Sequence, residues 1–385
     1  MGKRSLLNLI LPILLIVCLM IFGGTAKFAP ADVSPSAGLS APTASPAPPS
    51  GSPDGSGTPD STPDIPATPV VTPDPEYFTI TMIGDCTLAS VPAYQGTASG
   101  YDGVVGDDYA YPFAKTLSYF TDDDFTFANL ECSLTNSNNR TDKTFTFKCD
   151  PAYANIMKEG NVEFVTLANN HVLDYGQEGY DDTKAAVEAA GIAYAGRDEY
   201  AVYVTDSGLK IGVYAVSFGT VSQIEKGIAA LKEEGAEFII AALHWGDEGS
   251  YTPNKDQLTQ GRAAIDAGAD IVYGSHPHTL QPIEEYNGKY IYYSMGNWTF
   301  GGNTNPRDKD TFILRLTLER TWDGAVSIVS REHIPCACSG VEDGNNYQPV
   351  VYEKDSEGYS RVISKLDGSF TGSNLSINYG YSANE

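Results

Sequence analysis

Basic residues are scarce in this chain: 24 Lys and Arg stand against 49 Asp and Glu, for a formal net charge of -25. Binding to nucleic-acid phosphates requires clustered Lys and Arg, so this balance excludes nucleic acid as a partner. It also argues against docking on an anionic lipid surface. Charged residues make up only 19% of the chain and hydrophobic ones 42%, which excludes disorder for the chain as a whole.

Acidic residues are absent from residues 1–27, where 22 consecutive uncharged residues separate Arg4 from Lys27. About 20 apolar residues span a bilayer as a helix, and the preceding cations place the N-terminus in the cytoplasm. We therefore predict a single-pass signal anchor in the cell membrane, with the rest of the chain outside the cytoplasm. The alternative is a cleaved signal peptide and a secreted protein, since the most apolar part, 9–22, is short.

Basic residues are absent and aromatic ones nearly so in residues 28–76, which contain 13 of the 23 prolines. Such a segment cannot bury enough surface to offset its ordering entropy. Proline keeps it extended. We predict a disordered linker that holds a domain away from the membrane.

The remaining chain is typical of an α/β domain over residues 77–340, followed by a polar extension over 341–385 with little pattern. Short β-rich runs alternate with helical patterns, which favours a largely parallel or mixed sheet covered by helices. The predicted strands are 78–84, 124–130, 162–168, 210–218, 237–243, 269–275, 290–296 and 312–318. The predicted helices are 151–160, 180–190, 222–235 and 256–268, each ending at a glycine or just before one.

Histidine is rare, and four of the five histidines directly follow predicted strands. Open α/β sheets place ligand sites at the carboxyl ends of their strands. The polar residues at these positions are Asp85, Glu131, Asn170, His171, His244, His276, His278 and Asn297. A mixed set of carboxylate, amide and imidazole groups suits Mn, Fe or Zn, whereas Ca and Mg usually take oxygen ligands alone.

The pair His276 and His278 is the most specific part of this set. In an extended segment, residues two apart face the same side, so both imidazoles could reach one metal centre. A carboxylate can bridge two ions roughly 3.5–4 Å apart, the arrangement used for in-line displacement at phosphorus.

The motifs GDCTL, FANLECSLT, LANNHVLDYG, LHWGDE and GSHPHTLQPIEEYNGKYIYYSMGNW occur in this order between Phe78 and Gly302. They resemble the signature blocks of the bacterial capsule synthesis family CapA, also described as the poly-γ-glutamate biosynthesis family, within the calcineurin-like metallophosphoesterase superfamily. The resemblance implies two mixed β-sheets packed as a sandwich flanked by helices, in four αββα layers.

The resemblance also implies roles for individual residues. Asp85 and His278 would bind one metal, Glu131 would bridge, and Asn170, His244 and His276 would bind the second. His171 would be the general acid, tuned by Asp174. The superfamily commonly has a histidine where this chain has Thr87, so one-metal occupancy and loss of phosphatase activity are alternatives. Cys86 is a structural residue in this interpretation, because it would point away from the side that Asp85 faces.

Five cysteines lie outside the predicted anchor. Cys132 and Cys149 flank a short loop and are a candidate disulfide pair, since disulfides are permitted outside the cytoplasm.

Three hypotheses for function follow. The first is a membrane-anchored, metal-dependent and phosphoesterase-like protein of capsule or poly-γ-glutamate assembly, whose partners would be synthase subunits and an anionic polymer. The second is an extracellular metallophosphoesterase unrelated to capsule. The third is a non-enzymatic assembly scaffold. Whether the chain is an enzyme stays open at the level of the sequence.

Overall fold

The computed structural model describes residues 73–376. The predicted anchor of residues 1–27 and nearly all of the predicted linker of residues 28–76 lie outside the described residues. Among the helices of the described part, none is long and apolar enough to cross a membrane.

The first sheet has eight strands, seven of which lie side by side in one path, with the eighth pairing to β1. The path runs β16 (Val350–Val351), β15 (Val326–Ala337), β14 (Asp310–Arg320), β1 (Glu76–Thr87), β2 (Phe125–Leu130), β5 (Phe164–Thr166) and β6 (Ala193–Ala195), and the additional strand is β13 (Asn297–Phe300). Strands β1, β2, β5, β6 and β13 pair in parallel, whereas β14 and β15 join antiparallel.

The second sheet has six strands, with four parallel strands inside and an antiparallel strand at each edge. Its order is β11 (Ile283–Tyr286), β12 (Lys289–Tyr292), β10 (Ile271–Ser275), β9 (Phe238–His244), β8 (Lys210–Ser217) and β7 (Glu199–Val204). A small two-stranded sheet consists of β3 (Ser133–Leu134) and β4 (Lys148–Cys149). All eight predicted strands are confirmed; β6, β7, β11, β13, β15 and the two-residue strands were not predicted.

Helices pack on both outer faces of the sheet pair. The α-helices are α1 (Tyr101–Val105), α2 (Ala154–Glu159), α3 (Gly176–Ala190), α4 (Val221–Glu233), α5 (Lys255–Ala267) and α6 (Glu357–Leu366), and the 3-10 helices are η1 (Tyr111–Phe113), η2 (Leu117–Tyr119) and η3 (Pro151–Tyr153). The four predicted helices are confirmed, although α3 begins four residues before the predicted start. Gly191 and Gly268 end their helices in the left-handed conformation, whereas Gly160 has a φ of -80 and does not.

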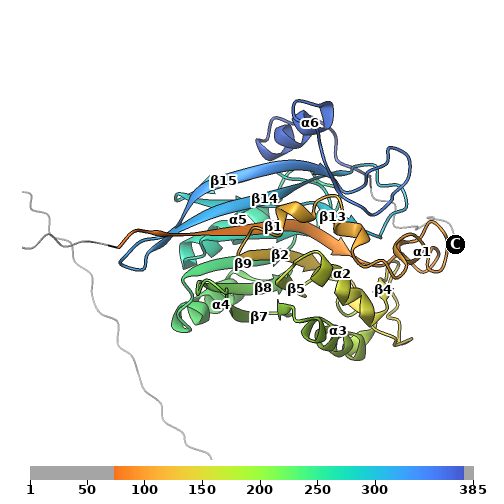
Figure 1. The fold of residues 1–385 in the computed structure, drawn as a ribbon, viewed down its shortest axis with the longest axis horizontal. Helices are drawn as coiled ribbons and strands as arrows, with labels where there is room; N and C mark the ends of the chain where they lie inside the picture. Colours follow the sequence, from red (N-terminus) through yellow and green to blue (C-terminus); the bar gives the residue numbers. More distant parts are fainter. Residues whose placement is uncertain (1–72, 377–385) are drawn as a thin grey trace, which may run out of the picture. The chain divides into compact units, whose positions relative to one another are not determined.

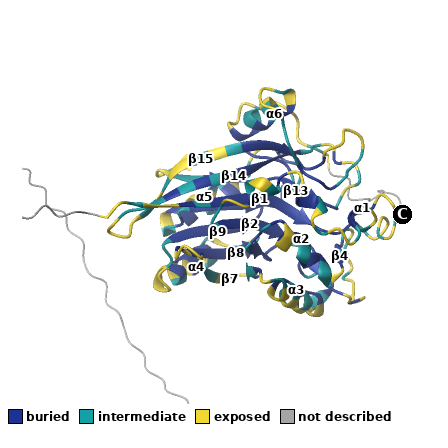
Figure 2. Cartoon of the chain, viewed as in Figure 1, coloured by how far each residue is buried: buried dark blue, intermediate teal, exposed yellow. Residues whose placement is uncertain are grey.

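Three clusters of buried side chains define the layers. One lies between the sheets, where Phe127 of β2 and Tyr273 of β10 meet with ring centroids 4.7 Å apart. A second joins the first sheet to α2 and α3, and a third joins the second sheet to α4 and α5. Figure 2 shows the strands as mostly buried and the outward side of α3 as exposed. The expected mixed α/β fold with more than one sheet is confirmed.

Residues 341–376 fold onto the first sheet, although their sequence predicted only a polar extension. Strand β16 pairs with β15, and α6 packs beyond β15 and β14 (Figure 1). Lys365 of α6 is 2% exposed and pairs with Asp308 at 2.6 Å and Asp310 at 2.7 Å. These ion pairs join segments that are far apart in the sequence, so the local pattern could not predict them.

Candidate metal centre

In two strands, the side chains that face the core between the sheets are followed, a few residues further on, by side chains of the polar site. In β2, Phe125 and Phe127 face the inter-sheet core, and Glu131 continues the same alternation just past the strand end. In β9, Ile240 and Ala242 face that core and His244 follows them. Strand β2 belongs to the first sheet and β9 to the second, and the packing of the two sheets brings their carboxyl ends together at the edge where the site lies.

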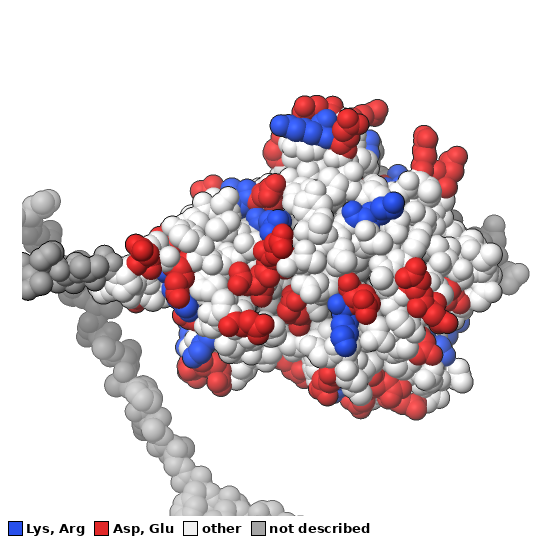
Figure 3. All heavy atoms as spheres, in the orientation of Figure 1, with Lys and Arg blue, Asp and Glu red and all other residues white. Residues whose placement is uncertain are grey.

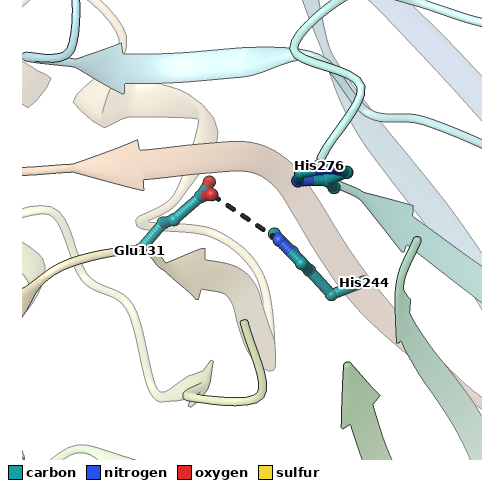
Figure 4. Close-up of side chains that lie close together, drawn as sticks. All are labelled: Glu131, His244 and His276. Carbon is teal, nitrogen blue, oxygen red and sulfur yellow. Dashed lines mark ion pairs between the residues drawn. The ribbon is translucent and has the colours of Figure 1, made fainter. Parts of the chain in front are cut away.

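Glu131 is shared by two groups of possible metal ligands. In the first group, Asp85 and His278 accompany it; in the second, His244 and His276 do. Oε1 of Glu131 lies 3.6 Å from Nε2 of His244 and 3.9 Å from Nε2 of His278. Figure 4 shows the carboxylate pointing at His244, with His276 beside them. The structure therefore brings together the residues that the sequence analysis assigned to two metals around one carboxylate.

The donor atoms of this site fit a divalent cation. Oε1 of Glu131 and Nδ1 of His276 are both buried and have no hydrogen-bond partner. Burial and the neighbouring Asp85 carboxylate raise the pKa of Glu131 well above its ordinary value. Buried polar atoms are normally paired. A cation between Asp85 and Glu131 would remove the repulsion of the two carboxylates, and a cation in the group of Glu131, His244 and His276 would give the unpartnered atoms a ligand bond. Residues of this kind would hold a divalent metal ion.

The histidines differ sharply in their surroundings. Burial and the neighbouring His278 and His171 lower the pKa of His276 to about 3. Burial, with His276 and His278 next, lowers the pKa of His244 well below its ordinary value. For His278, burial is outweighed by the Glu131 and Asp85 carboxylates, which raise its pKa to about 10. Neutral imidazoles are the metal-binding form, so His244 and His276 are already poised as ligands.

His276 and His278 converge, but not for the reason predicted. Strand β10 ends at Ser275, and the two histidines have φ values of 97° and 57°, so the segment is not extended. Non-glycine residues in this conformation are uncommon and cluster at functional sites. His278 places Nδ1 3.2 Å from Oδ2 of Asp85, and the His276 amide donates to the same oxygen at 3.4 Å.

Asn170 and His244 lie in direct contact. Oδ1 of Asn170 is 2.8 Å from Nε2 of His244, and the Ser275 hydroxyl is 2.9 Å from Nδ1 of the same ring. The serine orients the imidazole from behind, as outer partners of metal-binding histidines commonly do. Asn170 is thus placed beside the second group of possible ligands.

His171 and Asp174 form a hydrogen-bonded pair next to the metal-ligand groups. Nδ1 of His171 lies 2.7 Å from Oδ2 of Asp174. Asp174 also accepts from Nζ of Lys143 at 2.6 Å and from the Phe147 amide at 2.8 Å. Burial lowers the pKa of His171, and the Asp174 carboxylate opposes that effect. The ring of Phe147 packs edge-on against His171, with centroids 4.5 Å apart.

A cavity of about 500 Å³ opens onto this site and is lined by both His171 and His278. Aromatic side chains form part of its wall, and Arg307 and Asp308 contribute charges. Acidic groups are spread over the face of the domain seen in Figure 3, interspersed with basic ones. The cavity is large enough for a small ester or for the end of a polymer.

Several residues of the site were missed by the sequence analysis. Asn129 donates to Asp85 at 2.9 Å and to Glu131 at 3.4 Å, and so fixes the two carboxylates. Glu248 forms a third possible ligand group with His276 and His278. Phe218 is 57% exposed, has a φ of 47°, and lies with its ring centroid 5.0 Å from that of His276. Asn129 and Glu248 carried a signal, since they lie in the FANLECSLT and LHWGDE motifs, whereas Phe218 lies in none of the motifs.

The structure also shows the surroundings of Cys86 and Thr87, which follow Asp85 where the superfamily pattern differs from this chain. Cys86 is fully buried in the core between the first sheet and its helices, as expected for a structural residue. Thr87 is fully buried as well, and its hydroxyl has no hydrogen-bond partner.

The family model described as bacterial capsule synthesis protein PGA_cap matches residues 79–302, more than half of the chain. The chain belongs to this family. All residues of the two ligand groups that share Glu131 lie within the matched segment. The resemblance inferred from the sequence motifs is thereby confirmed.

Two relatives illustrate the match. The PGA biosynthesis protein CapA of Bacillus subtilis is 28% identical over 256 residues, which cover 58% of this chain and 64% of the relative. The chain thus spans less than two thirds of that protein. The capsule biosynthesis protein CapA of Bacillus anthracis is 26% identical over 338 residues, covering 78% of this chain and 79% of the relative.

Among solved structures, the NAD nucleotidase of Haemophilus influenzae aligns with a TM-score of 0.40 and 14% identity. The alignment covers 77% of this chain and 63% of the nucleotidase. A likeness this distant carries no information about activity.

Proposed function

We propose that this protein acts in capsule or poly-γ-glutamate synthesis outside the cytoplasm, with a site that binds one or two Mn, Fe or Zn ions and hydrolyses a phosphate ester. The observation that carries the proposal is that Glu131 belongs to both groups of possible metal ligands. One of its buried oxygens has no hydrogen-bond partner. The adjoining His171–Asp174 pair and the cavity add the parts that a hydrolytic site needs.

Bound divalent ions would supply Lewis acidity, lowering the pKa of water and drawing charge from a phosphoryl group. The protein's own contribution begins with His171. Its Nδ1 is held by Asp174, so Nε2 is the atom that gives a proton to the leaving oxygen. Asp174 fixes the tautomer and orientation of the ring, as a carboxylate partner does in other acid–base pairs.

Lys143 and Phe147 position this acid. Lys143 bridges Asp174 and the Asn170 carbonyl oxygen, with both contacts at 2.6 Å. It thereby links the proton donor to the segment that carries Asn170, a proposed metal ligand. Phe147 covers one side of the imidazole and keeps water from it.

The biological setting is proposed from the family and from the N-terminal sequence. The matched family and both named relatives are described as capsule or PGA synthesis proteins. The predicted anchor of residues 1–27 and the predicted linker of residues 28–76 favour a domain tethered outside the cell membrane. Synthase subunits and an anionic polymer are the proposed partners. Bound cations would offset repulsion between such a polymer and the acidic domain.

The test measures turnover of a generic aryl phosphate by the full chain with Mn, Fe or Zn added. We expect His171→Ala to abolish turnover while the bound metal per chain stays at the wild-type value. Metal binding without turnover of any phosphate ester would refute the hydrolytic part and favour a scaffold. No bound metal after reconstitution would refute the proposed centre itself.

The capsule part has a separate test. A strain lacking the gene is complemented with wild-type protein or with His171→Ala, and capsule is scored. Loss of capsule that only the wild type restores supports the proposal. A deletion strain with normal capsule would instead favour an extracellular phosphoesterase unrelated to capsule.

A further inference from the structure

Two buried thiols, those of Cys132 and Cys149, lie at the two ends of the loop that positions His171, the proposed general acid. Cys132 directly follows Glu131, and Cys149 ends β4. Their sulfur atoms lie 3.9 Å apart, and both residues belong to the core between the first sheet and its helices. Backbone hydrogen bonds at the two ends of the loop hold it closed, from the Ser133 amide to the Phe147 carbonyl and from the Thr135 amide to the Cys149 carbonyl, each 3.0 Å.

This loop connects the metal-ligand groups to the His171–Asp174 pair. It starts at the carboxylate shared by the two ligand groups, and within it lie Lys143 and Phe147. Those two residues contact Asp174, and Phe147 also packs on His171. Any constraint on the ends of the loop therefore limits the movement of the groups that position the proton donor.

We propose that Cys132 and Cys149 form a disulfide bond that closes this loop when the domain folds in an oxidising compartment. The sulfur–sulfur bond is about 2.05 Å long, so the two atoms need to approach by less than 2 Å. The parallel pairing of β3 with β4 already brings the two chain segments to adjacent positions. The other two thiols of this core, Cys86 and Cys336, have their sulfur atoms 3.7 Å from the Gly84 carbonyl and 3.2 Å from the Ile334 carbonyl, and neither contacts another sulfur in the described part.

The chemistry is an ordinary thiol–disulfide exchange. The two thiols lose two protons and two electrons, and an organic disulfide such as oxidised glutathione accepts them and becomes two thiols. Because both sulfurs are buried in the folded domain, an oxidant reaches them most readily before folding is complete. The bond is therefore a permanent closure of the loop and not a switch.

The test refolds the full chain with a mixture of oxidised and reduced glutathione, without metal or substrate. Free thiols are then alkylated and the unreduced peptides are analysed by mass spectrometry. We expect one peptide pair joining Cys132 to Cys149, with a mass two hydrogens below that of the reduced pair. We also expect a reducing agent to lower the melting temperature of the wild type by several degrees.

Two variants make the result decisive. The double variant Cys132→Ala, Cys149→Ala should melt at the same temperature with and without reductant. Cys338→Ala, which removes a buried thiol elsewhere, should respond to reductant as the wild type does. Alkylation of both Cys132 and Cys149 after oxidative refolding, or a bond from either one to another cysteine, would overturn the proposal. This readout needs no catalysis, so its failure leaves the proposed function untouched.

Discussion

Replacing Glu131 with glutamine is expected to have two effects of opposite sign on stability. Without metal, Glu131 is a fully buried carboxylate next to a second buried carboxylate, Asp85, and its pKa is raised by burial and by that neighbour. Glutamine has nearly the same shape but no charge. Removing an unfavourable buried charge should stabilise the metal-free protein near pH 7, because a raised pKa means that the ionised carboxylate disfavours the folded state there.

With metal, the same substitution should be harmful because both ligand groups lose their shared oxygen. At a metal concentration of about 100 times Kd, binding stabilises a folded protein by about 2.7 kcal/mol. If the variant binds about 100-fold more weakly, that stabilisation falls to about 0.4 kcal/mol at the same concentration. The lost difference of about 2.3 kcal/mol corresponds to about 4 °C in melting temperature for a domain of about 300 residues.

Thermal unfolding of the full chain in EDTA and in added Mn or Zn measures both effects. Glu163→Gln is the matched control. Glu163 is a half-buried carboxyl group, whose pKa burial raises to about 7, but it accepts from the Thr126 amide and belongs to neither ligand group. The control should keep the full wild-type response to metal. An unchanged metal response in Glu131→Gln would refute its role as the shared ligand. Destabilisation of that variant in EDTA would refute the argument from buried charge.

Three further substitutions test other parts of the structure. His244→Ala should lower the amount of metal bound per chain, measured by elemental analysis, whereas His333→Ala, outside the ligand groups, should leave it unchanged. Equal amounts of metal in the two variants would show that His244 is not a ligand. Asp174→Asn should move the alkaline limb of turnover to lower pH, because the carboxylate raises the pKa of His171 and the reaction needs the protonated ring; a limb that stays in place or moves to higher pH would contradict this role. Lys365→Ala should lower the free energy of unfolding in urea by about 3–5 kcal/mol, since it leaves two buried carboxylates without their shared partner. Replacing the exposed Lys354 with alanine should change it by less than about 0.5 kcal/mol. An equal effect of the two substitutions would show that the buried ion pairs contribute little.

Local patterns were sufficient to place the strands that carry the site. The alternation in β2 and β9 depends only on residues a few positions apart, and it leads to Glu131 and His244 at the strand ends. This pattern places each residue at the carboxyl end of its strand. The two strands belong to different sheets, so the proximity of Glu131 and His244 depends on how the sheets pack. The order of motifs along the chain was likewise enough to predict the family that the comparisons confirm.

Other features of the site depend on contacts between distant segments. His276 and His278 converge through a left-handed backbone after β10, stabilised by the contacts of Asp85 with this segment, and not through strand alternation. Asn129 contacts Asp85 through the pairing of β2 with β1, and Glu248 joins His276 and His278 where the segments after β9 and β10 meet. Both residues lie in motifs of the sequence, but the motifs alone do not give the atoms that these side chains contact.

The sequence by itself was enough to predict the order of anchor, linker and domain from composition, and the family from the order of its motifs. It also predicted most of the possible metal ligands, from their positions after strands and from what the family resemblance implies. Only the tertiary structure decided how His276 and His278 converge, that a lysine-bearing loop holds Asp174, and that α6 is joined to the first sheet by buried ion pairs. These arrangements arise where strands and loops far apart in the chain meet. Their electrostatic energies depend on distances and burial that no local pattern contains.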